Sequence, residues 1–400
     1  NSLTKAVVGT DDIANGTLFT YEIEVGDEDV YYYIPYAVNT FGESKSMDTK
    51  KFTTSTIDLS ANGTANTYIV SNSGRYSFNP HIIGNGQKGI ISADFHTDLA
   101  EINPVSAELL WESKSGMITN VEYRAYEKDV VFTSNGEEGN AVIVVKDDSG
   151  TIIWSWHIWC TDVPSDQSYI NRSGERFLVL DRNIGATRAD RGTGDEWKDA
   201  IGTGYQWGRK DPIIKNHHKN ADTESTIENA IANPNTFFME EGWMTEPLGY
   251  AWSPSVKTIY DPCPLGYRVA PKEIWTNFIL HDTYYYTNDY SLFNVVGEYN
   301  NGLDFVTDGT NTSYYPATMH GWWTTEIYPN LGRYWSANYT NESDSERGSA
   351  LNFDIDDTSL SIDQYWDTSS LKCVRCVKIS DKDMNGGGNE GITEEDQYEW

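Results

Sequence analysis

Three short runs of sequence decide the fold of this 400-residue chain. They are LDRNIGA at residues 180–186, GYQWGRKDP at 204–212 and YDPCPLGYRV at 260–269. Each run mixes glycine, proline, tryptophan and paired charges in a way that neither helical nor strand periodicity explains. Such a density of turn-forming residues predicts a loop-rich fold with specified turns.

The three runs and a later VRCV at 374–377 resemble the Fibrobacter succinogenes major paralogous domain (FISUMP). That family is common in surface proteins and fimbrillin-like pilus-tip proteins of gut Bacteroidetes. The resemblance covers Tyr169 to Ile379 and implies an α+β fold distantly related to C-type lectins. It also implies a surface-exposed binding or adhesion module, but a shared fold does not name a ligand.

Composition and charge exclude some functions. The chain has 60 acidic and 29 basic residues, a net charge of −31. Such a surface repels nucleic acid and anionic lipid, so a nucleic-acid partner is not expected. Aromatic residues make up 13% of the chain, with 14 Trp and 26 Tyr, which is typical of a β protein and unlike a disordered acidic chain.

The sequence also bears on localisation. Its apolar runs are all too short for a transmembrane helix. Asn1 begins neither a signal peptide nor a lipobox, so we expect a mature or truncated segment whose export signal or lipid anchor lies upstream. The resemblance implies a cell-surface protein, either an outer-membrane lipoprotein or an extracellular one.

We expect a multidomain chain in which β-sandwich modules precede the α+β lectin-like domain. Residues 1–54 resemble part of a fibronectin type III module whose front half is missing, which predicts an incomplete module with an exposed edge. Residues 55–163 have the strand spacing of an immunoglobulin-like sandwich. Residues 164–382 form the lectin-like domain, and residues 383–400 a flexible acidic tail.

Within the lectin-like domain, the pattern predicts few helices and short strands. The best helix lies at 271–280, with Pro271 at its start and Ile274 and Phe278 facing inward. A shorter helical segment is expected at 226–232. Strands are expected at 177–180, 333–339, 349–353 and 371–379.

The run TIIWSWHIW at 151–159 is the most aromatic strand of the chain. Trp154 and Trp156 share one face, and His157 and Trp159 the other. One interpretation is an aromatic strip that binds sugar. We favour a strand buried between two domains, because both faces are bulky and the run lies at an expected junction.

The four cysteines, Cys160, Cys263, Cys373 and Cys376, allow three pairings on spacing alone. In the family that the chain resembles, the positions of Cys263 and Cys376 are the usual cysteines. This implies a Cys263–Cys376 disulfide, and the two additional residues then suggest a Cys160–Cys373 pair. Disulfides fit an exported, oxidising setting. A redox CxxC role for 373–376 is disfavoured because its Val and Ile neighbours indicate a strand.

The family motifs have two interpretations, a ligand site or a buried polar brace. Arginine guanidinium groups can bridge carbonyls and carboxylates in loop-rich cores, so we favour the brace. The residues concerned are Asp181, Arg182, Asn183, Trp207, Arg209, Asp211 and Arg268.

The binding site is expected on loops, because loop aromatics are harder to bury than strand aromatics. Trp322, Trp323, Tyr285 and Tyr328 lie in Asn/Thr/Gly-rich stretches and are the candidate ligand-binding residues. A ring face that stacks on a sugar, flanked by amide or carboxylate hydrogen bonds, would form a glycan site.

Metal and catalytic signals are weak. Asp354 and Asp356 alternate, so they are expected on one strand face, but the chain has neither an EF-hand loop nor the motifs of Ca²⁺-dependent lectins. Asp354 and Asp356 are therefore only a weak Ca²⁺ candidate, and no cofactor is expected. The sequence has no nucleophile elbow and no P-loop.

The sequence therefore predicts a non-catalytic adhesion or glycan-binding protein whose partner is a glycan or another cell-surface ligand. The first alternative is a structural pilus or surface-assembly subunit that binds other proteins. The second is a glycan-processing enzyme, which would need two facing carboxylates.

Overall fold

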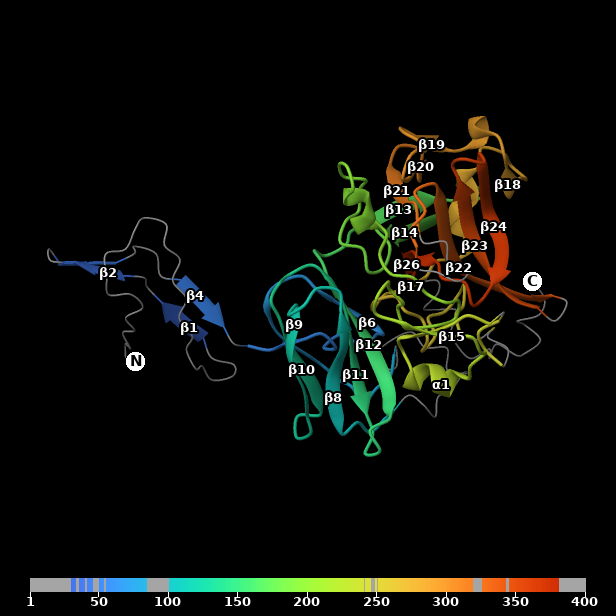
Figure 1. Ribbon diagram of the computed structural model, residues 1–400. Coiled ribbons are helices and arrows are strands. Elements are labelled where there is room, and N and C mark those ends of the chain that lie inside the picture. Colours follow the sequence, from blue (N-terminus) through green and yellow to red (C-terminus); the bar gives the residue numbers. More distant parts are fainter. Residues whose placement is uncertain are drawn as a thin grey trace. The chain divides into compact units, whose positions relative to one another are not determined.

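The fold was analysed in a computed structural model (Figure 1). It describes residues 30–33, 36–39, 42–45, 50–53, 55–84, 101–240, 242–245, 249, 251–318, 326–342 and 345–380. The chain divides into two compact units, Asn1–Ile57 and Asp58–Trp400. Both the expected sandwich and the expected lectin-like domain lie in the second unit.

The first unit contains two antiparallel strand pairs. β1 (Val30–Tyr33) pairs with β4 (Lys50–Thr53), and β2 (Tyr36–Asn39) pairs with β3 (Gly42–Lys45). β2 and β3 therefore form a hairpin. The expected acidic tail at 383–400 lies outside the described residues.

The second unit begins with a sandwich of two four-stranded sheets. One sheet has the order β5 (Ile57–Asp58), β7 (Gly74–Phe78), β10 (Asp129–Ser134), β9 (Ile118–Arg124). The other has the order β6 (Thr67–Val70), β12 (Ile152–Cys160), β11 (Gly139–Lys146), β8 (Ser106–Glu112). With β5 and β6 as two parts of the first strand, this is the order of a constant-type immunoglobulin sandwich.

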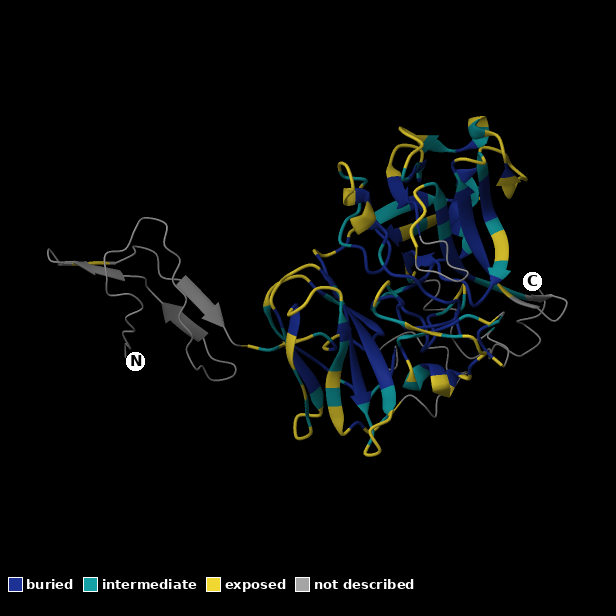
Figure 2. Cartoon of the chain, in the orientation of Figure 1, coloured by how far each residue is buried: buried dark blue, intermediate teal, exposed yellow. Residues whose placement is uncertain are grey.

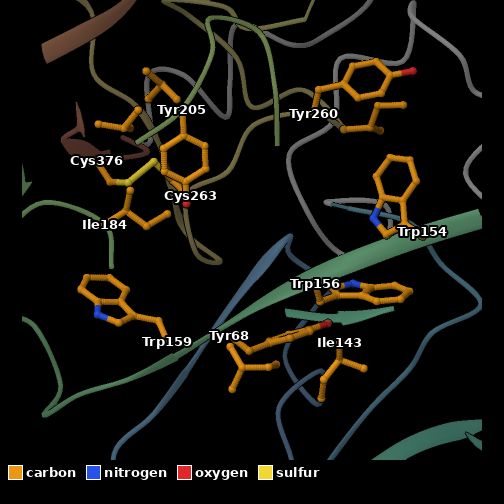
Figure 3. Packing of buried hydrophobic residues seen from close by; sticks show 14 of the residues in the cluster. Tyr68, Ile143, Trp154, Trp156, Trp159, Ile184, Tyr205, Tyr260, Cys263 and Cys376 are labelled. Carbon is orange, nitrogen blue, oxygen red and sulfur yellow. A yellow bond between two sulfur atoms is a disulfide. The ribbon is translucent and has the colours of Figure 1, made fainter. Parts of the chain in front are cut away.

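Strand β12 is buried on both faces (Figure 2), as predicted for the 151–159 run. Trp154, Trp156 and Trp159 are at most 1% exposed. The Trp156 ring packs on Phe78 of the opposite sheet, with 4.9 Å between ring centroids. Trp159 points to the other side and donates its indole N–H to the carbonyl of Ala186, 2.9 Å away. The sandwich and the following region therefore share one hydrophobic core (Figure 3).

The described residues after the sandwich form four small sheets. A four-stranded sheet has the order β13 (Asp166–Ile170), β14 (Arg176–Leu180), β26 (Cys376–Lys378), β17 (Tyr267–Val269). A five-stranded sheet has the order β18 (Tyr286–Thr287), β24 (Ser359–Asp367), β23 (Ser345–Asp354), β22 (Leu331–Glu342), β25 (Cys373–Val374). β19 (Val295–Val296), β20 (Gly302–Val306) and β21 (Thr312–Pro316) form the third sheet, and β15 (Lys219–Ala221) with β16 (Thr236–Phe238) the fourth.

Helices are few and short in this region. The segment expected at 226–232 is α1 (Ile227–Ala232), whose first turn is capped by the Thr226 hydroxyl accepting from the amide of Asn229. The segment expected at 271–280 is the 3₁₀ helix η3 (Lys272–Phe278), with Ile274, Trp275 and Phe278 buried. η2 (Glu196–Ala200) and η4 (Tyr290–Leu292) are also 3₁₀ helices. Within the described residues, none of these helices has the length and apolar character to cross a membrane.

The five-stranded sheet separates two hydrophobic clusters. Tyr334, Leu351 and Phe353 belong to a cluster with η3 and β20, while Trp335 and Ala350 belong to the cluster shared with the sandwich. These residues alternate along β22 and β23, so consecutive side chains enter different cores. The near-continuous apolar character of these strands follows from burial on both faces.

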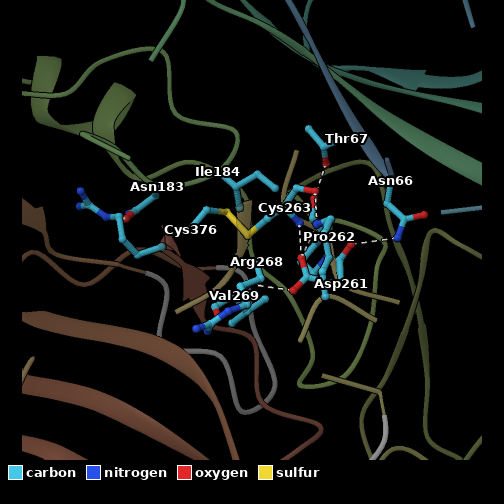
Figure 4. The surroundings of a disulfide bond; sticks show 12 residues. Asn66, Thr67, Asn183, Ile184, Asp261, Pro262, Cys263, Arg268, Val269 and Cys376 are labelled. Carbon is cyan, nitrogen blue, oxygen red and sulfur yellow. Dashed lines mark hydrogen bonds and ion pairs between the residues drawn. A yellow bond between two sulfur atoms is a disulfide. The ribbon is translucent and has the colours of Figure 1, made fainter. Parts of the chain in front are cut away.

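One of the two disulfide predictions is confirmed and the other is wrong. The Cys263–Cys376 disulfide is confirmed (Figure 4), and it closes a sequence separation of 113 residues. The predicted Cys160–Cys373 disulfide is wrong, because both residues are free and buried. Cys160 packs in the core shared with the sandwich, whereas Cys373 lies in the other cluster and donates its thiol to the carbonyl of Ile201. Two thiols in different cores cannot approach to bonding distance.

The disulfide arrangement predicts a thiol count and a stability effect. The unfolded, non-reduced chain should titrate two thiols, and a Cys263→Ala/Cys376→Ala variant should lose about 3 to 5 kcal/mol of unfolding free energy, because a long loop is no longer closed in the unfolded state. Urea unfolding measures the loss. Cys160→Ala/Cys373→Ala is the matched control, and an unreduced wild-type chain with no free thiol would contradict the assignment.

Candidate functional site

The tyrosine run at 284–286 forms an exposed ridge. Tyr284, Tyr285 and Tyr286 are 46%, 52% and 58% exposed. Tyr286 lies in β18 at the edge of the five-stranded sheet, where it pairs with Ser361 of β24. The amide of Ile362 donates to the carbonyl of Tyr285, 2.9 Å away. The sheet thus holds the backbone of the ridge while the rings face solvent.

Arg172 holds the backbone of the ridge in place. Its guanidinium donates to the carbonyls of Asp282 and Tyr284 at 2.8 and 2.9 Å. The same group lies 5.7 Å from the centroid of the Tyr285 ring. Tyr284 in turn stacks on His281, with 3.5 Å between ring centroids and 12° between ring planes. Two of the three rings are therefore held in place before any ligand binds.

Tyr328 lies at the same end of the sheet. It is 41% exposed and precedes β22, whose first residue, Leu331, pairs with Asp354 at the end of β23. Ser359, which begins β24, pairs with Asp354 from the other side, close to the Tyr286–Ser361 pair. Tyr285 and Tyr328, two of the four candidate ligand-binding residues, thus lie at one end of one sheet. The other two candidates, Trp322 and Trp323, lie outside the described residues.

The carboxylates at this end stabilise a turn. The expectation that Asp354 and Asp356 share a strand face is wrong, because β23 ends at Asp354 and Asp356 follows in the turn. Asp354 accepts from the amides of Asp356 and Asp357 at 3.0 and 3.1 Å, and Asp356 accepts from the side-chain amide of Asn330 at 2.6 Å. In the part of the chain that the structure describes, no three His, Cys, Asp or Glu side chains are placed to hold a metal together.

The residues of the three motif runs are buried rather than exposed to a ligand. Asp181, Arg182, Asn183, Trp207, Arg209, Asp211 and Arg268 are each at most 6% exposed. Arg182 donates to Asp181 at 2.8 Å and to Asp162, which ties the first motif to the end of the sandwich. Arg209 donates to the carbonyls of Asn233 and Pro234 at 2.9 and 3.0 Å, just beyond α1. Such contacts are those of a structural brace.

The third motif holds the sandwich directly (Figure 4). The side-chain amide of Asn66 donates to the carbonyls of Ile259 and Asp261 at 2.7 and 2.9 Å, and the Thr67 hydroxyl donates to the carbonyl of Pro262 at 2.7 Å. The carboxylate of Asp261 accepts from Lys257 at 2.9 Å and from the amide of Val269 at 2.8 Å. The buried carboxylate of Asp261 therefore stabilises the loop that accepts hydrogen bonds from Asn66 and Thr67.

His157 of β12 also links the sandwich to the region that follows it. Its Nε2 lies 2.9 Å from the Asn140 side-chain oxygen, and its Nδ1 lies 3.3 Å from the Tyr205 hydroxyl. Asn140 uses its amide nitrogen to donate to Gly185, so its oxygen accepts from the imidazole N–H. Burial lowers the pKa of His157 to about 3, so its ring is neutral at pH 7.

Comparisons with protein-family models, with curated proteins and with solved structures found no match to this chain. The geometry of the described residues therefore carries the functional argument.

His157 predicts a pH dependence of stability. Its pKa falls from about 6.5 in the unfolded chain to about 3 in the folded one, so between these pH values only the unfolded chain binds the proton. The unfolding free energy should therefore fall with decreasing pH, by up to about 1.4 kcal/mol per pH unit from this residue. Urea unfolding between pH 7 and 4 measures the slope.

The variant His157→Gln keeps one donor and one acceptor but does not titrate, so its slope over this range should be shallower than that of the wild type. His281→Gln is the matched substitution at an exposed position, away from the buried contact. Parallel curves for wild type and His157→Gln would refute the assignment.

Proposed function

We propose that this chain is a non-catalytic cell-surface protein that binds a glycan on the ridge Tyr284–Tyr286. The observation that carries the proposal is the exposure of three consecutive tyrosines on a backbone held by β24 and Arg172. Sugars bind to aromatic faces with polar groups beside them, and a platform that is already rigid loses little entropy on binding.

Neighbouring groups support a polar ligand. Tyr328 and the turn with Asn330 and Asp356 lie at the same end of the sheet as the ridge. These side chains offer carboxylate and amide groups that can exchange hydrogen bonds with hydroxyls. A protein ligand would be expected to bury a larger and more apolar surface.

We further propose a C-type-lectin-like fold of the FISUMP class for residues 164–382. Three features support it: the order of the four motifs, the pairing of the early strand β14 with the late strand β26, and the disulfide between the third and fourth motifs. A disulfide is also in keeping with export to an oxidising compartment, and thus with a location at the cell surface.

A glycan array tests the function. The purified chain should bind a defined set of glycans, and Tyr284→Ala/Tyr285→Ala should weaken binding about tenfold or more, because each lost stacking ring removes on the order of 1 kcal/mol. Tyr126→Ala is the matched control, since Tyr126 is 94% exposed on the sandwich hairpin between β9 and β10.

Two other outcomes would change the proposal. Binding that survives the tyrosine substitutions but is lost in Trp322→Ala/Trp323→Ala would move the glycan site to residues 319–325. A folded chain that binds no glycan would overturn the glycan proposal in favour of a surface-assembly subunit that recognises proteins.

A further inference from the structure

A buried lysine without a hydrogen-bond partner lies on the sheet away from the tyrosine ridge. Lys372, which precedes β25, is only 3% exposed. Its ammonium lies 4.6 Å from the ring centroid of Trp335 and 4.3 Å from that of Trp366. Across the described residues its ammonium has no hydrogen bond and no carboxylate within ion-pair distance. The two indole faces offset only part of the cost of burying a charge.

The nearest acid is engaged elsewhere. Asp367 follows Trp366 in β24, but its carboxylate lies 3.8 Å from the guanidinium of Arg347. Lys257, another fully buried lysine, shows the contrast, since it donates to Asp261 at 2.9 Å and to the carbonyl of Cys263 at 2.8 Å. Burial alone therefore does not explain why Lys372 has no partner.

Further donors with no partner lie near Lys372. The parallel pairing of Tyr334 with Cys373 places Arg333 and Lys372 at adjacent positions, one residue earlier on each strand. The Nε of Arg333 is buried without a hydrogen bond, and so are the hydroxyls of Thr368 and Ser370 in the segment that leads to Lys372. Buried polar groups are nearly always paired with protein, water or ligand. Each hydroxyl can donate or accept and so fits any polar partner, whereas the two neighbouring cations, Lys372 and Arg333, favour a negatively charged one.

We propose that Lys372 is the principal donor of an anion site that accepts one small negative group, either a halide ion or the carboxylate of a larger ligand. Arg333 supplies a second positive charge close by. A neutral water molecule would satisfy single donors but would add no negative charge beside the two neighbouring cations. Burial and the nearby Arg333 lower the pKa of Lys372 well below its usual value, and a bound anion would oppose both effects.

A groove lies beside this position, with Trp366 in its wall. It has a volume of about 160 Å³ and is lined by Arg347, Gln364, Tyr365, Trp366 and Asp367. Trp366 belongs to both the lysine site and the groove, because its ring contacts Lys372 and the residue also lines the groove. A group of halide or carboxylate size fits this space, whose charged lining residues are Arg347 and Asp367, 3.8 Å apart. The net charge of −31 opposes anions at long range, so binding must depend on these local charges.

Chloride is the probe for this site. Titration of the whole chain with sodium chloride, followed by the chlorine-35 NMR line width, should show a saturable broadening from bound chloride. Lys372→Met should abolish that broadening. Lys198→Met should leave it unchanged, because Lys198 also lies beside a tryptophan ring, 5.9 Å from the Trp197 centroid, but is exposed and paired with Asp195.

Thermal unfolding of the same variants separates binding from folding. Lys372→Met should fold with equal or greater stability, since it replaces a buried unpaired cation by an apolar side chain of similar shape. Broadening that persists in folded Lys372→Met, or that is absent from the wild type, would overturn the proposal.

Competition distinguishes the two sources of the anion. Sodium acetate and sodium glucuronate should both displace chloride if the site accepts a carboxylate, and glucose at the same concentration should not. Displacement by neither carboxylate would restrict the site to halides. Glucuronate that displaces chloride at lower concentration than acetate would identify a carboxylated sugar as the larger ligand. This site does not depend on the tyrosine ridge, so either proposal can fail alone.

Discussion

The burial of strand β12 on both faces is the constraint on which the rest of the structure depends. One face completes the interior of the sandwich, as Trp156 against Phe78 illustrates. The other face can leave water only if a second layer covers it, because Trp159 and His157 would otherwise be exposed. The three motif runs supply that layer, and their carbonyls and carboxylates satisfy the polar atoms of the strand.

That requirement explains why the most distinctive sequence of the chain is structural. Loops without regular hydrogen bonding must satisfy their backbone groups in other ways when they are buried. Arg209 does so with one guanidinium that reaches several carbonyls, and Asp261 with one carboxylate that accepts from both backbone and side chain. The ridge proposed to bind a ligand lies on β18, outside these motifs, where exposed rings take nothing from the core.

The positions of the strands could be predicted from the sequence because their periodicity and composition are local properties. The buried Trp strand followed from bulky residues on both faces, and the short helix α1 from a helix-compatible segment. Tertiary facts were harder to infer: Cys160 and Cys373 each occupy an apolar position in a separate core, and no sequence spacing reveals which core a cysteine enters. The turn at Asp356 was missed because Asp354 and Asp356 continue the alternation of the strand before them. Lys372 was also missed, since its isolation depends on the register between β22 and β25.

The shared core also limits how this chain can be divided or inherited. Proteins assembled from independent modules can exchange them at linkers, because few contacts cross a boundary. Here Asn66 and Thr67 on one side each donate to loop carbonyls on the other, and His157 lies within hydrogen-bond distance of the Tyr205 hydroxyl. Recombination near residue 163 would separate matched surfaces and leave tryptophans facing water. The sandwich and the region that follows are therefore expected to evolve as one unit. Substitutions on one side of their shared contact would be matched by substitutions on the other side, and neither part would be exchanged alone.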